Sequence, residues 1–181
     1  MPENKISARE IQEQDIEPII NYWLNASDEF MTGMGVDLTK MPTREQWRNF
    51  LHEQLSQSYK EKKSYCIVWL LNDQPVGHSN ISKIIFGKEA FMHLHLWNKD
   101  TRQKGLGTDL VKKTLPYYFN NMELQTLYCE PYALNPPPNK TLKRVGFDLV
   151  KAYTCIPGWL NFEQEVNLWE MKREKFEVYG V

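Results

Sequence analysis

A short glycine-bearing segment constrains this fold more than any other part of the sequence. The apolar stretch at 93–97 is typical of a strand, the loop at 102–107 carries two glycines with an arginine and a lysine, and an amphipathic helix follows directly. The first N–H groups of a helix have no partners within it, and its dipole places partial positive charge there. Because glycine has no side chain, a phosphate can approach this backbone closely. The sequence therefore predicts an anion site at the helix start.

Two well-known phosphate loops do not match this segment. A P-loop requires Lys and then Ser or Thr after its last glycine, whereas Gly107 is followed by Thr108. The dinucleotide fingerprint requires a glycine where this chain has Leu110, and the strand here is not the first of an early parallel pair. A plain helix-entry turn without a ligand therefore remains the alternative to an anion site.

The charges of the chain nearly balance, which limits the function classes. Its 181 residues carry 22 Lys and Arg against 23 Asp and Glu. Binding nucleic acid as a main task needs a basic surplus, so we expect no nucleic-acid partner. No apolar run approaches the roughly 20 residues of a membrane helix, and the stretch 1–5 is too polar for a signal peptide, so we expect no membrane partner. Three widely spaced cysteines without a CxxC pair favour a reduced, cytoplasmic protein.

Hydrophobic periodicity and turn residues predict an α/β fold. The expected order is β-α-α-β-β-β-α-β-α-β-β, a mixed sheet with flanking helices in a single domain over residues 1–181. The expected strands cover 6–11, 65–71, 76–86, 90–97, 124–130, 147–153 and 165–172. The expected helices cover 16–24, a stretch after Pro42, a stretch after Gly107, and 140–145.

Local signals set several boundaries. Asp15 is the expected N-cap of the first helix, and Thr43 and Gln46 have the spacing of a capping box at the second. The three prolines at 136–138 are expected to form a turn. The Met- and Gly-rich stretch 30–35 is expected to be a loop, either a plain connector or an apolar lid over a pocket.

The full pattern, Arg-x-x-Gly-x-Gly between a strand and a helix, resembles the acetyl-CoA pyrophosphate motif of the GNAT acetyltransferase superfamily. The resemblance continues at Asn135, at the run 142–145 and at Gly146-Phe147, where the glycine also closes a helix. The order of elements is similar to the GNAT fold from roughly residue 5 to 173. This resemblance implies a GNAT-like acyl-CoA acyltransferase fold with acetyl-CoA as co-substrate. It implies an N-acetyltransferase in which a primary amine, of a small molecule or a protein N-terminus, attacks the thioester directly.

The resemblance also implies which residues contact the coenzyme. The backbone from His95 to Trp97, at a bulge that splays the strand from its neighbour, would bind the pantetheine arm, and nearby N–H groups would stabilise the oxyanion. Main-chain N–H groups at 103–108 would hold the pyrophosphate, and two asparagines would contact the coenzyme from the other side. The expected coenzyme-binding residues are Leu96, Trp97, Arg102, Gln103, Lys104, Gly105, Leu106, Gly107, Thr108, Asn135 and Asn139.

One position departs from the family pattern. Many members carry a tyrosine four residues before the Gly-Phe pair, where it protonates the leaving thiolate, but this chain has Leu142 there. Tyr132, just past the fifth strand, is the candidate to replace it, against the alternative of a half-buried loop aromatic.

A general base is expected close to the same site. His93 and His95 are two residues apart on one strand and so project from the same face; His95 is favoured because it lies nearer the glycine motif. Glu130 is the carboxylate candidate. Hydrogen-bonded sheet histidines and an exposed strand-end acid are the alternatives. No carboxylate or Cys completes a ligand set with the histidine pair, so we expect no metal, and His52 and His78 have no context that indicates a function.

The aromatic residues divide between core and acceptor site. Trp23, Trp47 and Trp69 fall on apolar faces and are expected in the core. Trp159 and Phe162 lie in a loop that borders the acceptor groove in the fold that the chain resembles, so they are the expected substrate-binding residues. The alternative is that this loop packs its aromatic side chains for stability.

Two functions stay open from the sequence alone. The first is acetyl transfer from acetyl-CoA to an amine acceptor. The second is a non-catalytic acyl-CoA-binding regulatory domain on the same fold, motivated by Leu142. Neither the acceptor nor the oligomeric state follows from the sequence, and a homodimer is one option.

Overall fold

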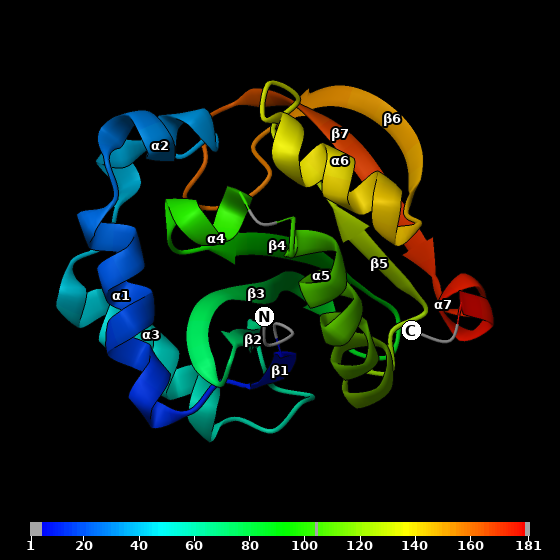
Figure 1. Ribbon diagram of the computed structural model, residues 1–181, viewed down its shortest axis with the longest axis horizontal. Helices are drawn as coiled ribbons and strands as arrows, with labels where there is room; N and C mark the ends of the chain where they lie inside the picture. The colour runs from blue at the N-terminus through cyan, green and yellow to red at the C-terminus, as the bar shows by residue number, and fades with distance from the viewer. Residues whose placement is uncertain (1–4, 104, 180–181) are drawn as a thin grey trace.

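The computed structural model describes residues 5–103 and 105–179. These residues form a seven-stranded sheet in the order β1-β2-β3-β4-β5-β7-β6 (Figure 1). The strands are β1 Ile6–Glu10, β2 Tyr65–Leu71, β3 Gln74–Ile85, β4 Glu89–Leu96, β5 Thr126–Cys129, β6 Asp148–Cys155 and β7 Gln164–Lys172. All neighbouring strands pair antiparallel except β4 and β5, which are parallel. The predicted mixed sheet is confirmed.

Helices flank this sheet. They are α1 Ile16–Asn25, α2 Asp28–Gly33, α3 Arg44–Ser56, α4 Lys99–Gln103, α5 Gly107–Pro116, α6 Pro136–Val145 and α7 Arg173–Tyr179. Single turns η1 (Glu13–Asp15), η2 (Leu38–Lys40) and the π-helical η3 (Tyr117–Asn121) complete the described elements. Figure 1 shows α1, α2 and α3 grouped at one side of the molecule, away from α5 and α6.

Each face of the sheet carries its own hydrophobic core. Successive side chains of β2 point to opposite faces, so Ile67 and Trp69 belong to the core of α5 and α6, whereas Cys66 belongs to that of α1 and α3. The Trp69 indole Nε1 donates to Thr114 Oγ1 over 2.7 Å, which joins β2 to α5. The amphipathic helices predicted from the sequence therefore pack against both faces of the sheet.

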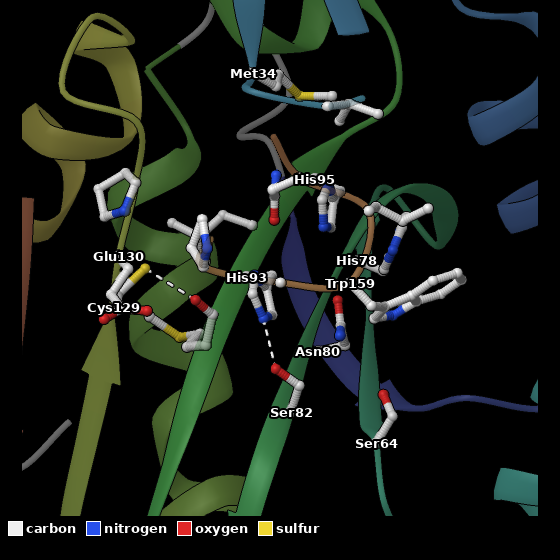
Figure 2. Close-up of a pocket in the computed structure, with 18 of the residues that line it drawn as sticks. Met34, Ser64, His78, Asn80, Ser82, His93, His95, Cys129, Glu130 and Trp159 are labelled. Carbon is white, nitrogen blue, oxygen red and sulfur yellow. Dashed lines mark hydrogen bonds between the residues drawn. The ribbon is translucent and has the colours of Figure 1, made fainter. Parts of the chain in front are cut away.

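The sheet opens between β4 and β5. The two strands pair only from Glu89↔Thr126 to Phe91↔Tyr128, and within the described residues no strand pairs with β4 on that edge from there to Leu96. Beyond the last pair, the Cys129 thiol donates to the Met92 carbonyl oxygen at 2.9 Å (Figure 2). The separation of β4 from its neighbour, predicted at 95–97, thus begins earlier in the strand, after Phe91. The predicted bulge there is wrong, because β4 keeps an unbroken register with β3 from Phe91 to Leu96.

Several local predictions are confirmed. Thr43 accepts a hydrogen bond from the Gln46 amide, and the Gln46 side chain accepts one from the Thr43 amide, so the capping box forms. Gly146 takes the left-handed conformation with φ 109° at the C-cap of α6. Trp23, Trp47 and Trp69 are all buried.

Other local predictions are wrong for identifiable reasons. Asp15 occupies the predicted N-cap position of α1, but its side chain makes no capping hydrogen bond; the buried carboxylate pairs with Arg9 and accepts from the Gln12 amide. The stretch 30–35 is partly helical, because Ser27 caps α2 and accepts from the Phe30 amide. The prolines 136–138 form the first turn of α6, a position where the missing N–H costs nothing. Two short helices, α4 and α7, were not predicted.

Candidate active site

A cavity of about 650 Å³ lies on the side of the gap between β4 and β5 that faces α1 and α3. β3, β4 and the end of β5 form one wall, α1 and α3 another, and the loop 156–164 closes it. Figure 2 shows His78, His93 and His95 reaching into it from β3 and β4, with Glu130 and Trp159 at its edges. These residues come from four separate parts of the chain, so only the folded sheet brings them together.

The three histidines form a contiguous group. His78 and His95 face each other across β3 and β4, and their rings stack with centroids 4.7 Å apart. The Trp97 indole donates to His78 Nδ1 at 2.8 Å, which leaves Nε2 of a neutral His78 to carry the proton. His95 Nδ1 lies 3.2 Å from the Tyr22 hydroxyl, and His93 Nε2 lies 2.8 Å from Ser82 Oγ. Each ring is therefore held in place by a protein partner.

Burial keeps these imidazoles uncharged. Desolvation, with the charge of neighbouring His93, lowers the pKa of His78 to about 3. Desolvation and the nearby Lys83 ammonium lower the pKa of His93 to about 4. The pKa of His95 lies well below its ordinary value, first because of burial and then because of the other two rings. At neutral pH the group is neutral and offers hydrogen-bond acceptors and donors without charge.

Glu130 follows β5 and faces the cavity from the other side. Its side chain is only 4% exposed. Lys83 Nζ lies 3.4 Å from Oε2, and the Tyr153 hydroxyl donates to Oε1. Burial and this hydrogen bond raise the pKa of Tyr153, which therefore keeps its proton. Glu130 is a buried, partnered carboxylate rather than the exposed strand-end acid that was the alternative.

Tyr132 lines the cavity two residues further on. Its ring packs edge-to-face on Phe162 with centroids 5.8 Å apart, and its backbone forms a bridge with Val166. Among the residues that the structure describes, none hydrogen-bonds its hydroxyl. Leu142, by contrast, is fully buried in the core under α6, so its side chain does not reach the cavity.

The predicted anion site has the expected backbone form. Gly105 takes φ +70°, and Leu106, which precedes the ten-residue helix α5, has no side chain able to cap it. The N–H groups of the first turn, including that of Thr108, are therefore without a side-chain cap. A Cβ at Gly107 would lie 3.4 Å from Thr141 Oγ1, an ordinary van der Waals contact, so α5 lies close to α6 at this residue. Lys104 lies outside the described residues, and of Gln103 only the backbone is described, at the end of α4.

Arg102 points back toward β4. Its guanidinium donates to the carbonyl oxygens of Leu96 and Trp97, at 3.0 and 3.2 Å, and stacks on the Phe30 ring with Cζ 3.8 Å from the centroid. In this conformation the two carbonyls predicted to meet the pantetheine arm are occupied by Arg102. The Trp97 amide donates to Val76, on β3.

The two asparagines differ in what they contact. Asn135 precedes α6 without capping it and lines the cavity. The Asn139 amide is engaged within the protein: it donates to the carbonyls of Tyr132 and Asn135 and accepts from Asn167 and Trp169. Asn139 thus fixes the 132–135 loop, and its contact with a coenzyme stays a prediction.

Tryptophans form the far wall of the cavity. Trp23 and Trp47 stack with centroids 5.4 Å apart, and Trp159 lies against Trp47 at 5.6 Å. Trp159 is 57% exposed and lines the cavity, whereas Phe162 is not one of the lining residues and packs its ring against Tyr132.

The sequence interpretation missed His78, and it missed that Trp23 and Trp47 line a cavity as well as the core. His78 can be identified as a site residue only from its pairing with His95. That pairing is known only once the sheet register is known.

The site combines an uncapped helix start beside a splayed pair of parallel strands with a cavity that leads away from the splay. The sequence matches the acetyltransferase (GNAT) domain family over residues 6–148, and the chain belongs to that family. It is an acetyltransferase, and the resemblance drawn from the glycine segment is confirmed.

Solved structures have the same fold at low sequence identity. Spermidine N-acetyltransferase from Vibrio cholerae, in complex with CoA and spermine, matches with TM-score 0.76 and 14% identity over 95% of this chain and 98% of that one. Aminoglycoside acetyltransferase AAC(6')-Ib, with coenzyme A and kanamycin, gives 0.74 and 16% over 98% and 100%. RimL, a ribosomal alpha-N-protein acetyltransferase with CoA, gives 0.75 and 13% over 94% and 95%. A search of curated proteins found no significant match.

Within residues 5–103 and 105–179, no helix has the length and apolar character needed to cross a membrane. Within the same ranges, no group of three or more His, Cys, Asp or Glu side chains is placed to hold a metal ion.

Proposed function

We propose that this protein transfers the acetyl group of acetyl-CoA to a primary amine, by direct attack of the amine on the thioester. The observation that carries the proposal is one continuous cavity from the β4–β5 gap to an aromatic wall. Coenzyme A in the similar solved structures supports acetyl-CoA as the co-substrate.

The coenzyme side fits an acyl-CoA by its chemistry. The uncapped N–H groups at the start of α5 suit a pyrophosphate, with Gly105 and Gly107 keeping side chains away. The free edge of β4 beyond Phe91 offers backbone groups to an extended amide-bearing arm. Arg102 would then exchange its carbonyl contacts at Leu96 and Trp97 for the phosphates.

The acceptor must attack as a neutral amine. A cavity of neutral imidazoles and apolar walls disfavours the ammonium form, so it lowers the pKa of the amine that enters it. The amine nitrogen forms a bond to the acetyl carbon, the C–S bond breaks, and the nitrogen gives up one proton. We assign that proton to Glu130 or to His95, both in the cavity wall.

Tyr132 is assigned as the proton donor to the leaving thiolate. Its place in the cavity wall next to Glu130, with no described side chain hydrogen-bonded to its hydroxyl, supports the role. The buried position of Leu142 removes the usual family position from consideration. With Tyr132 as donor, thiolate release and proton transfer occur on the same side of the gap.

Two measurements test the proposal. Isothermal titration should give acetyl-CoA binding, and thiol release over a panel of primary amines should give turnover with matching N-acetylated product. No binding at millimolar acetyl-CoA would overturn the coenzyme assignment. Binding without turnover on any acceptor would favour the regulatory acyl-CoA-binding alternative.

A further inference from the structure

The tryptophan-lined end of the cavity, where the acceptor amine would bind, points to a narrower class of substrate. We infer that the acceptor is a monoamine with a flat apolar body, an arylalkyl monoamine, and that polyamines and aminoglycosides are poor acceptors. This inference rests on the proposed acetyl transfer and concerns only which amine enters.

The walls of this end are planar and apolar. Trp23, Trp47 and Trp159 follow one another with ring centroids 5.4 and 5.6 Å apart, and Phe50 lies 6.4 Å from Trp159. Trp23 also packs edge-on against His95, with centroids 4.8 Å apart, so the aromatic surface reaches the histidine group. Met34 adds a polarizable thioether to the same lining. Stacking of an aromatic ring on such a surface is favourable, because the rings present flat apolar area.

The charges of the lining do not suit a polycation. Among the described lining residues Glu130 is the sole carboxylate, and Lys83 and Tyr153 already engage it. Lys63 and Lys83 contribute two ammonium groups to the same cavity. Each further ammonium of a bound polyamine would leave water without a carboxylate partner, which is costly.

The three histidines also favour a monoamine over a polyamine as the acceptor. His78, His93 and His95 stay neutral at pH 7, so they can hydrogen-bond one amine but do not offer anionic charge to a second. An amine with one nitrogen beside His95 and an aromatic body against the tryptophans satisfies both parts of the cavity. A spermine chain or a kanamycin ring system could place one amine beside His95, but it lacks the aromatic body and leaves its further ammonium groups without a carboxylate partner.

The experiment compares kcat/KM for four acceptors with the full chain and saturating acetyl-CoA: 2-phenylethylamine, tryptamine, spermine and kanamycin. We expect the two arylalkyl monoamines to exceed both polycations by about 10- to 100-fold, the usual range for a missing or unpaired contact in a pocket. Spermine or kanamycin at or above the arylalkyl amines would overturn the inference. So would acetyl-CoA binding with no turnover of either arylalkyl amine. Loss of acetyl-CoA binding itself would instead refute the proposed function.

Two pairs of variants test which residues set the preference for arylalkyl monoamines over polycations. Trp159→Ala should raise KM for tryptamine about tenfold, whereas the KM of Trp159→Phe should stay near the wild-type value, because only the alanine variant lacks an aromatic ring at this position. The side chain is 57% exposed, so the fold should tolerate both. Lys63→Glu should raise the use of spermine relative to tryptamine, whereas Lys60→Glu, outside the cavity lining, should not. Equal effects of the two lysine variants would show that bulk charge, not the cavity, sets the preference, and would overturn the inference.

Discussion

The proposed coenzyme side and the proposed acceptor side of this molecule are built in opposite ways. The coenzyme side is nearly contiguous: the free end of β4, Arg102, Gly105 and the start of α5 follow one another within about a dozen residues. The acceptor side assembles Trp23, Trp47, the histidines and Trp159, which span more than half of the chain. The coenzyme side therefore depends on backbone groups that the local sequence positions. The acceptor side depends on side chains that tertiary packing brings together.

This difference determines what substitutions should do. Backbone N–H groups are insensitive to most side-chain changes, so only a change that adds bulk or charge beside them should matter. A side-chain cavity should respond to each wall residue separately.

Gly105→Asp should weaken acetyl-CoA binding by about 100- to 1,000-fold, since a carboxylate beside a pyrophosphate costs several kcal/mol. Gly105→Asn is the matched control, because asparagine tolerates the φ of +70° and carries no charge. It should change the Kd only a few-fold. Isothermal titration measures both, and similar losses in the two variants would contradict an anion site at this loop.

Tyr132→Phe should lower kcat by about 100-fold and leave the acetyl-CoA Kd unchanged, as expected on removing a general acid. Tyr128→Phe is the control: Tyr128 stacks on Phe91 and lies outside the cavity lining. Steady-state thiol release gives kcat. An unchanged kcat in Tyr132→Phe would remove the tyrosine from the mechanism.

Gly35→Ala should lower the free energy of unfolding by about 2–4 kcal/mol. A Cβ there would lie 1.9 Å from Gln164 Oε1, and φ is +85°. The Gly35 carbonyl also accepts from Asn161 and Gln164, which ties the segment after α2 to the loop over the cavity.

Gly33→Ala is the control for that variant, because a Cβ at Gly33 meets nothing within 4 Å. It should change stability by no more than about 1 kcal/mol. Chemical denaturation of both variants makes the comparison. Equal stability of the two would show that the Gly35 contact does not hold this loop.

The fold should lose stability as pH falls below the ordinary histidine range. The buried histidines have folded pKa values near 3 and 4, below the unfolded value of about 6.5, so the unfolded state binds more protons between these limits. One such histidine lowers the free energy of unfolding by about 2 kcal/mol between pH 7 and pH 5.

His78→Asn should therefore reduce the loss by about that amount. Denaturation curves at both pH values measure the difference. The same loss in His78→Asn as in wild type would show that His78 is not kept neutral by the fold.

Much of the fold was predictable because its signals are local. Periodicity placed every strand, the Thr43–Gln46 pair began α3, and Gly146 ended α6. The errors arose where a tertiary contact or an unusual cap overrode the local signal. The side chain of Asp15, at the predicted N-cap position, pairs with Arg9 instead of making a capping hydrogen bond, and the three prolines begin a helix where the sequence predicts a turn.

The candidate site divides in the same way. The glycine loop could be identified from its own residues, because an anion site on backbone groups needs only a strand, glycines and a helix start. His78 could not, since its role depends on facing His95 across a strand pair. The second role of Trp23 and Trp47, as walls of a cavity, likewise depends on how α1 and α3 lie over the sheet.

A crystal structure of the protein with acetyl-CoA tests the central claim most directly, because that claim is geometric. The pyrophosphate is expected at the N–H groups that begin α5, and the pantetheine arm between β4 beyond Phe91 and the end of β5, with the thioester facing the cavity at Glu130 and Tyr132. A coenzyme bound elsewhere, or a thioester directed away from the cavity, would contradict the account.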